Sequence, residues 1–214
     1  MKKVMFYYVR HGGTLFNVLN RMQGWCDSPL TDQGIREAEE AKELLKSVPF
    51  KAAYVSASER CRDTCAIIVE GRDIPVYERK GLKEVNFGTW EAVEVPIHLE
   101  EINRRRGDGI HWDDCGGDSD ETFAKHKETY ERIYEECSDG DTILIVFHGA
   151  AQLWMQRILL GADSGKYGKL REEKGLVKLP NGFNGVFSCT DGVWRLEQAP
   201  GFSSEEIASL SNPV

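Results

Sequence analysis

The sequence predicts an α/β protein with three layers, in which helices cover both faces of a mostly parallel central sheet and a small insertion lies over one edge. Short runs of strand-forming residues alternate with helical patterns along the chain, which is typical of parallel sheets. No internal repeat or low-complexity tract interrupts this alternation. The 214 residues, 41% of them hydrophobic, are enough for a domain with a real core.

Two strands and one helix are expected near the start of the chain. The strand-forming residues 4–9 predict a buried strand. Thr31 is expected to cap a helix that reaches about Ser47, because an apolar stripe at helical spacing follows it. That stripe consists of Ile35, Ala38, Ala41, Leu44 and Leu45. The segment AAYVS, residues 52–56, predicts the second strand.

The same alternation continues through the middle and the end of the chain. ERCRDTCAIIVEG predicts a helix that stops near Gly71, and IPVYER predicts a third strand. TILIVF, residues 142–147, is expected to be a central strand, followed by a helix over residues 150–161. GVFSCTDGVWRLEQ predicts a hairpin, because an Asp-Gly pair separates two alternating runs.

The periodic patterns lapse between about residues 91 and 119. A short helix, glycine-rich breaks and mixed charge indicate an insertion here, placed over the edge of the sheet where a ligand would bind. A long polar helix over residues 119–137, with Phe123, Tyr130, Ile133 and Tyr134 on one face, leads back to the core. We therefore expect residues 1–214 to form a single domain.

The charge and the cysteine content exclude several classes of function. With 27 basic and 35 acidic residues, the net charge of -8 opposes binding to nucleic acid and to anionic membrane surfaces, so an anionic ligand needs a local basic cluster. The first apolar run is too short for a signal peptide or a membrane span, so we expect a cytoplasmic protein. Six cysteines without a C-x2-C pair predict reduced thiols.

Basic and imidazole side chains follow three of the predicted strands. Arg10 and His11 end the first strand, Arg60 lies in the first turn after the second, and His148 with Gly149 follows TILIVF. Ligands of open α/β sheets bind outside the carboxyl ends of the strands. If these strands are neighbours, four cationic or potentially cationic groups face one small volume, which is unfavourable unless a compact dianion occupies it. A phosphoryl group fits this requirement.

Donors of other kinds lie near the same strand ends. The planar fork of arginine can bind two phosphate oxygens at once. The backbone amides of Gly12, Gly13 and Gly149 are unobstructed by side chains and can approach a further oxygen. Thr14 and Asn17 can add neutral donors.

Five motifs resemble those of the histidine phosphatase superfamily, which includes the cofactor-dependent phosphoglycerate mutases. They are RHGGTLFN, RMQGWCDSPLTDQG, SASERCRDT, LKEVNFGTWE and FHG, and they occur in the family's order over residues 6–149. The last third of the chain carries none of them.

The resemblance implies phosphoryl transfer through a phosphohistidine, without metal and without an organic cofactor. It implies that His11 attacks phosphorus while Arg10, Arg60 and His148 neutralise the oxygens. Glu84 matches the family's proton donor, whose pKa a bound phosphate would raise. Further positions that match contacts to phosphate or substrate are Asn17, Gln23 and Gly24.

The chain departs from the family pattern at a few positions. Gly13 stands where Glu or Gln is usual, and we expect altered loop rigidity or substrate contact there rather than lost chemistry. Ala92 replaces a common Gly. Asp118 and His126 replace a Glu and an Arg, which bears on substrate specificity.

Three functions fit these residues. The first is a phosphatase for a small phosphomonoester, favoured by a short tail and an abbreviated insertion. The second is a phosphoglycerate mutase, which would need 2,3-bisphosphoglycerate. The third is a non-catalytic phosphate-binding module. Arg60 is also compatible with an ion pair to Glu59, and Asn17 with a role that only shapes a turn. The sequence leaves open whether the protein forms a homo-oligomer.

Overall fold

A computed structural model describes residues 1–107, 112–118, 120–160, 163–176 and 179–210. In these residues one six-stranded sheet has the order β3-β2-β4-β1-β5-β6. Its strands are β1 (Lys3–Arg10), β2 (Ala52–Ser56), β3 (Val76–Arg79), β4 (Thr142–Phe147), β5 (Gly182–Thr190) and β6 (Val193–Gln198). The predicted strands 52–56 and 142–147 are confirmed.

The sheet is mostly parallel, as the alternation predicted. β4 lies between β1 and β2 and runs parallel to both, and β3 runs parallel to β2. Arg10 pairs with Phe147 at the carboxyl ends of β1 and β4. The hairpin β5–β6 completes the sheet in antiparallel orientation, and its turn residues Asp191 and Gly192 have positive φ values of 47° and 86°.

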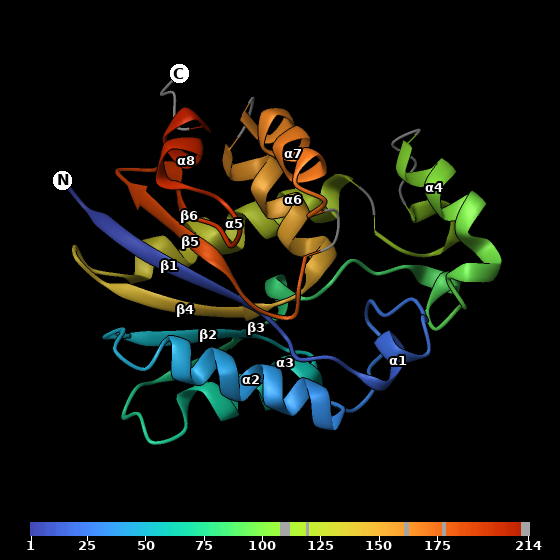
Figure 1. The fold of residues 1–214 in the computed structure, drawn as a ribbon, viewed down its shortest axis with the longest axis horizontal. Coiled ribbons are helices and arrows are strands. Elements are labelled where there is room, and N and C mark those ends of the chain that lie inside the picture. Colours follow the sequence, from blue (N-terminus) through green and yellow to red (C-terminus); the bar gives the residue numbers. More distant parts are fainter. Residues whose placement is uncertain (108–111, 119, 161–162, 177–178, 211–214) are drawn as a thin grey trace.

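Helices cover both faces of the sheet (Figure 1). On one face lie α2 (Asp32–Leu44) and α3 (Glu59–Val69), which pack against each other. On the other face lie α5 (Asp120–Glu136) and α6 (Gly149–Leu160), with α7 (Asp163–Glu173) and α8 (Ser204–Leu210) beside them. The arrangement is the predicted three-layer α/β/α fold.

An apolar core lies on each face because successive side chains of a strand point to opposite sides. Phe6 and Tyr8 of β1 belong to the core under α5, α6 and α8, whereas Val9 belongs to the core under α2 and α3. β4 is buried on both faces, with residues Ile143 to Phe147 inaccessible or nearly so. Its continuous apolar sequence is therefore what a central parallel strand requires.

Some predicted details are wrong. Helix α2 begins after the Thr31 cap as expected, but it ends at Leu44, and Ile35 and Leu44 of the predicted stripe are 39% and 61% exposed. The buried stripe is narrower because α2 packs through small residues, Gly34, Ala38 and Ala41. Helices α7 and α8 were not predicted from the sequence.

The segment after β3 lies at the edge of the sheet where the strands end (Figure 1). It holds α4 (Leu99–Gly107) and several 3-10 turns, and its Val85, Phe87, Ile102 and Trp112 form an apolar cluster together with Met22 from the N-terminal part of the chain. None of the helices in the described ranges combines the length and the apolar composition needed to cross a bilayer.

Three glycines allow the first turn of α2 to touch the loop after β1. A Cβ atom on Gly12 would lie 2.1 Å from the carbonyl oxygen of Gly34, and one on Gly34 would lie 2.0 Å from that of Gly13. Real Cβ atoms essentially never approach that closely, so the contact depends on bare backbone on both sides.

Gly34→Ala is therefore expected to destabilise the protein although it lies in a helix. In a helix, alanine is more favourable than glycine by about 0.5–1 kcal/mol. The overlap with Gly13 should cost about 1–3 kcal/mol and outweigh that gain. Gly168→Ala, in open space on α7, is the control and should be stabilising. Urea unfolding measures both; equal changes in the free energy of unfolding would contradict the packing argument.

Candidate active site

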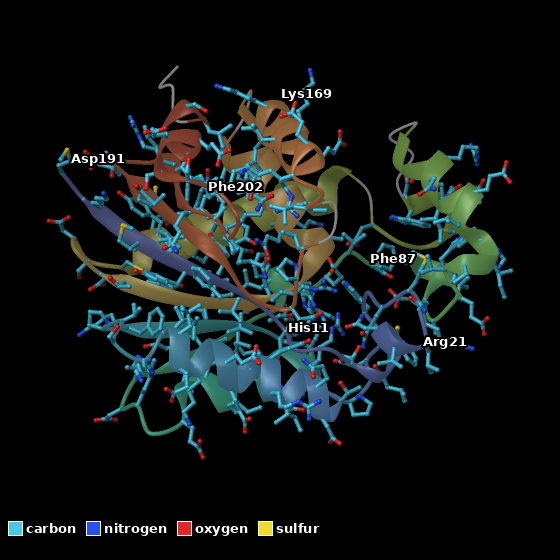
Figure 2. The ribbon with its side chains drawn as sticks, in the orientation of Figure 1. His11, Arg21, Phe87, Lys169, Asp191 and Phe202 are labelled. Carbon is cyan, nitrogen blue, oxygen red and sulfur yellow. The ribbon has the colours of Figure 1, made fainter. Side chains whose placement is uncertain are left out.

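The predicted strand-end residues meet at one edge of the sheet. Figure 2 labels His11 at the carboxyl end of β1, on the side where Phe87 and Arg21 lie. Its ring centroid is 5.4 Å from that of His148, which follows β4 directly. Arg60, in the first turn of α3, donates from Nη2 to Nδ1 of His148 at 2.9 Å. The parallel strands therefore bring both imidazoles and Arg60 together.

His11 has a fixed orientation. Its Nδ1 lies 2.9 Å from the backbone oxygen of Gly12, so this nitrogen carries the proton and Nε2 keeps its lone pair. Burial, with Arg60 and Arg10 adding positive charge, lowers the pKa of His11 well below its ordinary value. His11 is therefore neutral near pH 7, as a nucleophile must be.

His148 is held by both ring nitrogens. Nδ1 accepts from Arg60, so Nε2 carries the proton and donates it to Oγ of Ser56 at 2.7 Å. Burial lowers the pKa of His148 well below its ordinary value, and the positive charges of Arg60 and Arg10 lower it further. Of the four cationic or potentially cationic groups at the strand ends, the two arginines therefore carry the charge, because a buried imidazole beside them stays neutral.

Arg60 is fully buried and ties three segments together. Nη1 donates to the carbonyl of Cys26 at 3.1 Å and to the carboxylate of Asp27 at 2.8 Å. Nη2 donates to the carbonyl of Gly24 at 2.8 Å as well as to His148. Nε is buried and meets no acceptor among the described residues. Buried donors normally have partners, so this Nε is an exception that the protein leaves unsatisfied.

Arg10 approaches the start of α6. Its Nη1 donates to the carbonyl of Leu179 at 2.6 Å, and its buried Nε has no acceptor in the described part of the chain. A Cβ atom on Gly149 would lie 3.1 Å from this Nε, so glycine permits the close approach. Burial lowers the pKa of Arg10, partly offset by Glu84, but an arginine stays protonated at neutral pH.

Glu84 reaches the same helix start from the segment after β3. Oε1 accepts the amides of Val85 at 2.9 Å and Ala151 at 2.7 Å, and Oε2 accepts that of Ala150 at 3.0 Å. Burial raises the pKa of Glu84, while these amides and Arg60 act in the opposite direction. The net raised pKa is the property that a proton donor near neutral pH needs.

Two predicted anion donors are engaged within the protein. The amide of Gly12 donates to Oγ1 of Thr64 at 3.0 Å, and that of Gly13 donates to the carboxylate of Glu37 at 2.7 Å. The expectation that both amides face an anion is thus wrong for this arrangement, because α2 and α3 pack directly against the loop.

The predicted contact residues Thr14, Asn17, Gln23 and Gly24 lie in the segment of residues 14–24. Thr14 caps α1 (Leu15–Val18) in a reciprocal capping box with Asn17, and its hydroxyl donates to Gln23 at 2.6 Å. Gln23 in turn donates to Ser28 at 3.0 Å. The amide of Gly24 donates to Glu91 at 3.1 Å. These polar groups hold the loop in its shape.

Several residues at the site were not predicted from the sequence. The side-chain amide of Asn181 donates from Nδ2 to the backbone carbonyl of His11 at 2.6 Å, and Asn181 lies in a region without motifs. Asp27 and Glu37 contact Arg60 and Gly13 as described above. Asp27 lies within a family motif, so its position was visible, but its partner 33 residues away was not. No group of three or more candidate metal ligands occurs in the described residues.

Two departures from the family pattern have structural explanations. Ala92 adopts a positive φ of 63°, a conformation that favours glycine, so its Cβ imposes a cost of about 1–2 kcal/mol. The carboxylate of Asp118 accepts the amide of Asn86 at 2.8 Å and so holds the segment that follows Glu84.

Comparison with known proteins places the chain in a family. Residues 6–179 match the model of the histidine phosphatase superfamily (branch 1). The chain therefore belongs to the histidine phosphatase superfamily.

The relatives include both a mutase and a phosphatase. A 2,3-bisphosphoglycerate-dependent phosphoglycerate mutase 2 of Gloeobacter violaceus is 33% identical over 150 residues, covering 66% of this chain and 68% of the relative. An adenosylcobalamin/alpha-ribazole phosphatase of Salmonella typhimurium is 30% identical over 162 residues, covering 72% and 78%. The solved structure of Bacillus stearothermophilus YhfR has a TM-score of 0.75 and 26% identity, covering 95% and 99%.

The neutral state of His148 should make stability depend on pH. Because its folded pKa lies well below 6.5, the unfolded chain binds one more proton below that pH. The free energy of unfolding then falls as the pH drops, by up to about 1.4 kcal/mol per pH unit for each such histidine. His148→Asn should remove the contribution of one proton from this slope, as measured by urea unfolding at several pH values below 6.5. An identical slope would contradict a neutral His148.

Proposed function

We propose that this protein is a phosphatase that hydrolyses a small phosphomonoester through a phosphohistidine on His11. The observation that carries the proposal is the hydrogen bond from His11 Nδ1 to the Gly12 carbonyl, which reserves Nε2 for phosphorus. Arg10 and Arg60, each with a buried Nε that lacks a protein acceptor in the described ranges, supply positive charge for the phosphoryl oxygens.

The reaction proceeds in two steps. In the first, Nε2 of His11 bonds to phosphorus, the bond from phosphorus to the ester oxygen breaks, and Glu84 gives its proton to the leaving oxygen. In the second, water attacks the phosphohistidine while the Glu84 carboxylate takes a proton from it, and the bond to Nε2 breaks. The raised pKa of Glu84 supports its role as the acid.

His148 acts in this scheme by orienting Arg60, with which it shares a hydrogen bond. We assign phosphate or substrate contacts to Thr14, Asn17, Gln23, Gly24 and Gly149. Support for Gly24 comes from its carbonyl, which binds Arg60, and support for Gly149 from its approach to Arg10.

We also propose that residues 1–214 act as one domain in the cytoplasm on a small phosphorylated metabolite, without nucleic acid. The net charge of -8 supports a ligand that is bound locally rather than a polyanion bound over a wide surface. No metal or organic cofactor takes part in the proposed steps.

A phosphoglycerate mutase is the second candidate, favoured by the 33% identity to the Gloeobacter violaceus mutase. A mutase must return the phosphoryl group to a substrate before water reaches it. Incubation with 3-phosphoglycerate and 2,3-bisphosphoglycerate discriminates the two: isomerisation faster than phosphate release would assign the mutase.

His11→Ala is expected to abolish hydrolysis of p-nitrophenyl phosphate, measured in EDTA. Loss of the nucleophile should lower kcat by a factor of about 10³ or more. His98→Ala, at an exposed histidine, is the control and should retain wild-type activity. Unchanged turnover in the His11 variant would overturn the assignment of the nucleophile.

Glu84→Gln is expected to trap the phosphohistidine when the substrate is an aryl phosphate. The leaving group of an aryl phosphate needs little protonation, so His11 is still phosphorylated in this variant. The water of the second step, however, is no longer activated by a carboxylate. Steady-state turnover should fall by about 10²–10⁴-fold, and intact-protein mass spectrometry should detect the added phosphoryl group. Normal turnover without a trapped species would contradict the role of Glu84.

A further inference from the structure

Gly13 lies in the loop after β1, and a carboxylate from another element lies next to it. A Cβ atom on Gly13 would lie 3.2 Å from Oε2 of Glu37. The same oxygen accepts the Gly13 amide at 2.7 Å. Glu37 belongs to α2, 24 residues further along the chain. Its carboxylate therefore borders the position from which a side chain at residue 13 would start.

Glu37 is part of one face of α2 that holds the loop. Thr31, Gly34 and Glu37 follow one another at intervals of three residues, so they share this face. Thr31 donates both its amide, at 2.9 Å, and its hydroxyl, at 3.0 Å, to the carbonyl of Gly13. Because Glu37 accepts the Gly13 amide, α2 binds both polar backbone groups of this residue.

Glu37 also acts on Arg10. The Arg10 guanidinium is buried, and the charges of Glu84 and Glu37 both raise its pKa against the effect of burial. The geometric contact of this carboxylate with the loop is the hydrogen bond to the Gly13 amide.

We propose that Glu37 is a positioning residue for phosphoryl transfer: it supplies from α2 the acceptor that fixes Gly13, and thereby holds Arg10 and His11 in place. The inference rests on the proposed function, since it concerns the same site.

Three variants on α2 separate positioning from folding. Glu37→Ala should lower kcat for p-nitrophenyl phosphate about tenfold, because a misplaced nucleophile loses orientation. Glu37→Gln keeps an acceptor oxygen and should stay within about threefold of wild type, with KM unchanged or lower because a negative charge is removed. Glu40→Ala, at an exposed carboxylate of the same helix, is the control.

The inference fails if Glu37→Ala stays within about twofold of wild type, or if Glu37→Gln loses as much activity as Glu37→Ala. The melting temperature of Glu37→Gln should stay within about 4 °C of wild type. A larger fall in that variant would assign Glu37 a folding role and would also overturn the inference.

Moving the carboxylate tests the shared space directly. Gly13→Glu alone should lose activity, because two carboxylates then compete for one location. Adding Glu37→Ala should restore activity about tenfold relative to Gly13→Glu, a coupling that independent effects would not give. A double variant no better than Gly13→Glu would contradict the inference. This comparison does not depend on the stability of Glu37→Ala by itself.

Vanadate binding provides a readout that needs no turnover. Vanadate takes the five-coordinate geometry of the transition state, whereas inorganic phosphate does not. Glu37→Ala should therefore weaken vanadate binding about tenfold and leave phosphate binding within about threefold. Equal effects on both ligands would overturn the inference. Wild-type protein that binds vanadate but hydrolyses no ester would instead refute the proposed function. The ratio of the changes in vanadate and phosphate affinity in Glu37→Ala would still decide the inference.

Discussion

The site depends on the parallel pairing of β4 with both β1 and β2. Because the three strands run in the same direction, their carboxyl ends meet at one edge, where the loop with His11, the start of α6 after His148 and the first turn of α3 converge. An antiparallel β4 would carry His148 to the opposite end of the sheet. The continuous burial of β4 on both faces secures this pairing and thus the catalytic geometry.

Burial and charge together then decide the protonation states. Two guanidinium groups lie in a site with little access to water, so neither His11 nor His148 can gain a proton without adding another cation beside them. Asp27 offsets the charge of Arg60, and Glu84 and Glu37 act on Arg10. The burial that keeps His11 neutral also raises the pKa of Glu84, and the two guanidinium groups favour a bound anion.

The sequence predicted the elements whose patterns are local. TILIVF is apolar throughout and Asp191-Gly192 is a strong turn signal, so the central strand and the hairpin were visible, and the strand-end rule then joined Arg10, His11, Arg60 and His148. Contacts between distant segments were not visible, because no spacing links Asn181 to His11 or Glu37 to Gly13. Helix α7 was missed because its apolar residues, such as Tyr167 and Leu170, are too few for a clear stripe.

The most direct test of the account is the protonation of the two imidazoles, measured by long-range proton–nitrogen correlation NMR in the ligand-free protein at pH 7. The account predicts two neutral rings, with the proton of His11 on Nδ1 and that of His148 on Nε2. A proton on Nε2 of His11 would contradict it, because the lone pair for phosphorus would then be absent, and an imidazolium at His148 would contradict it, because Nδ1 could then not accept from Arg60.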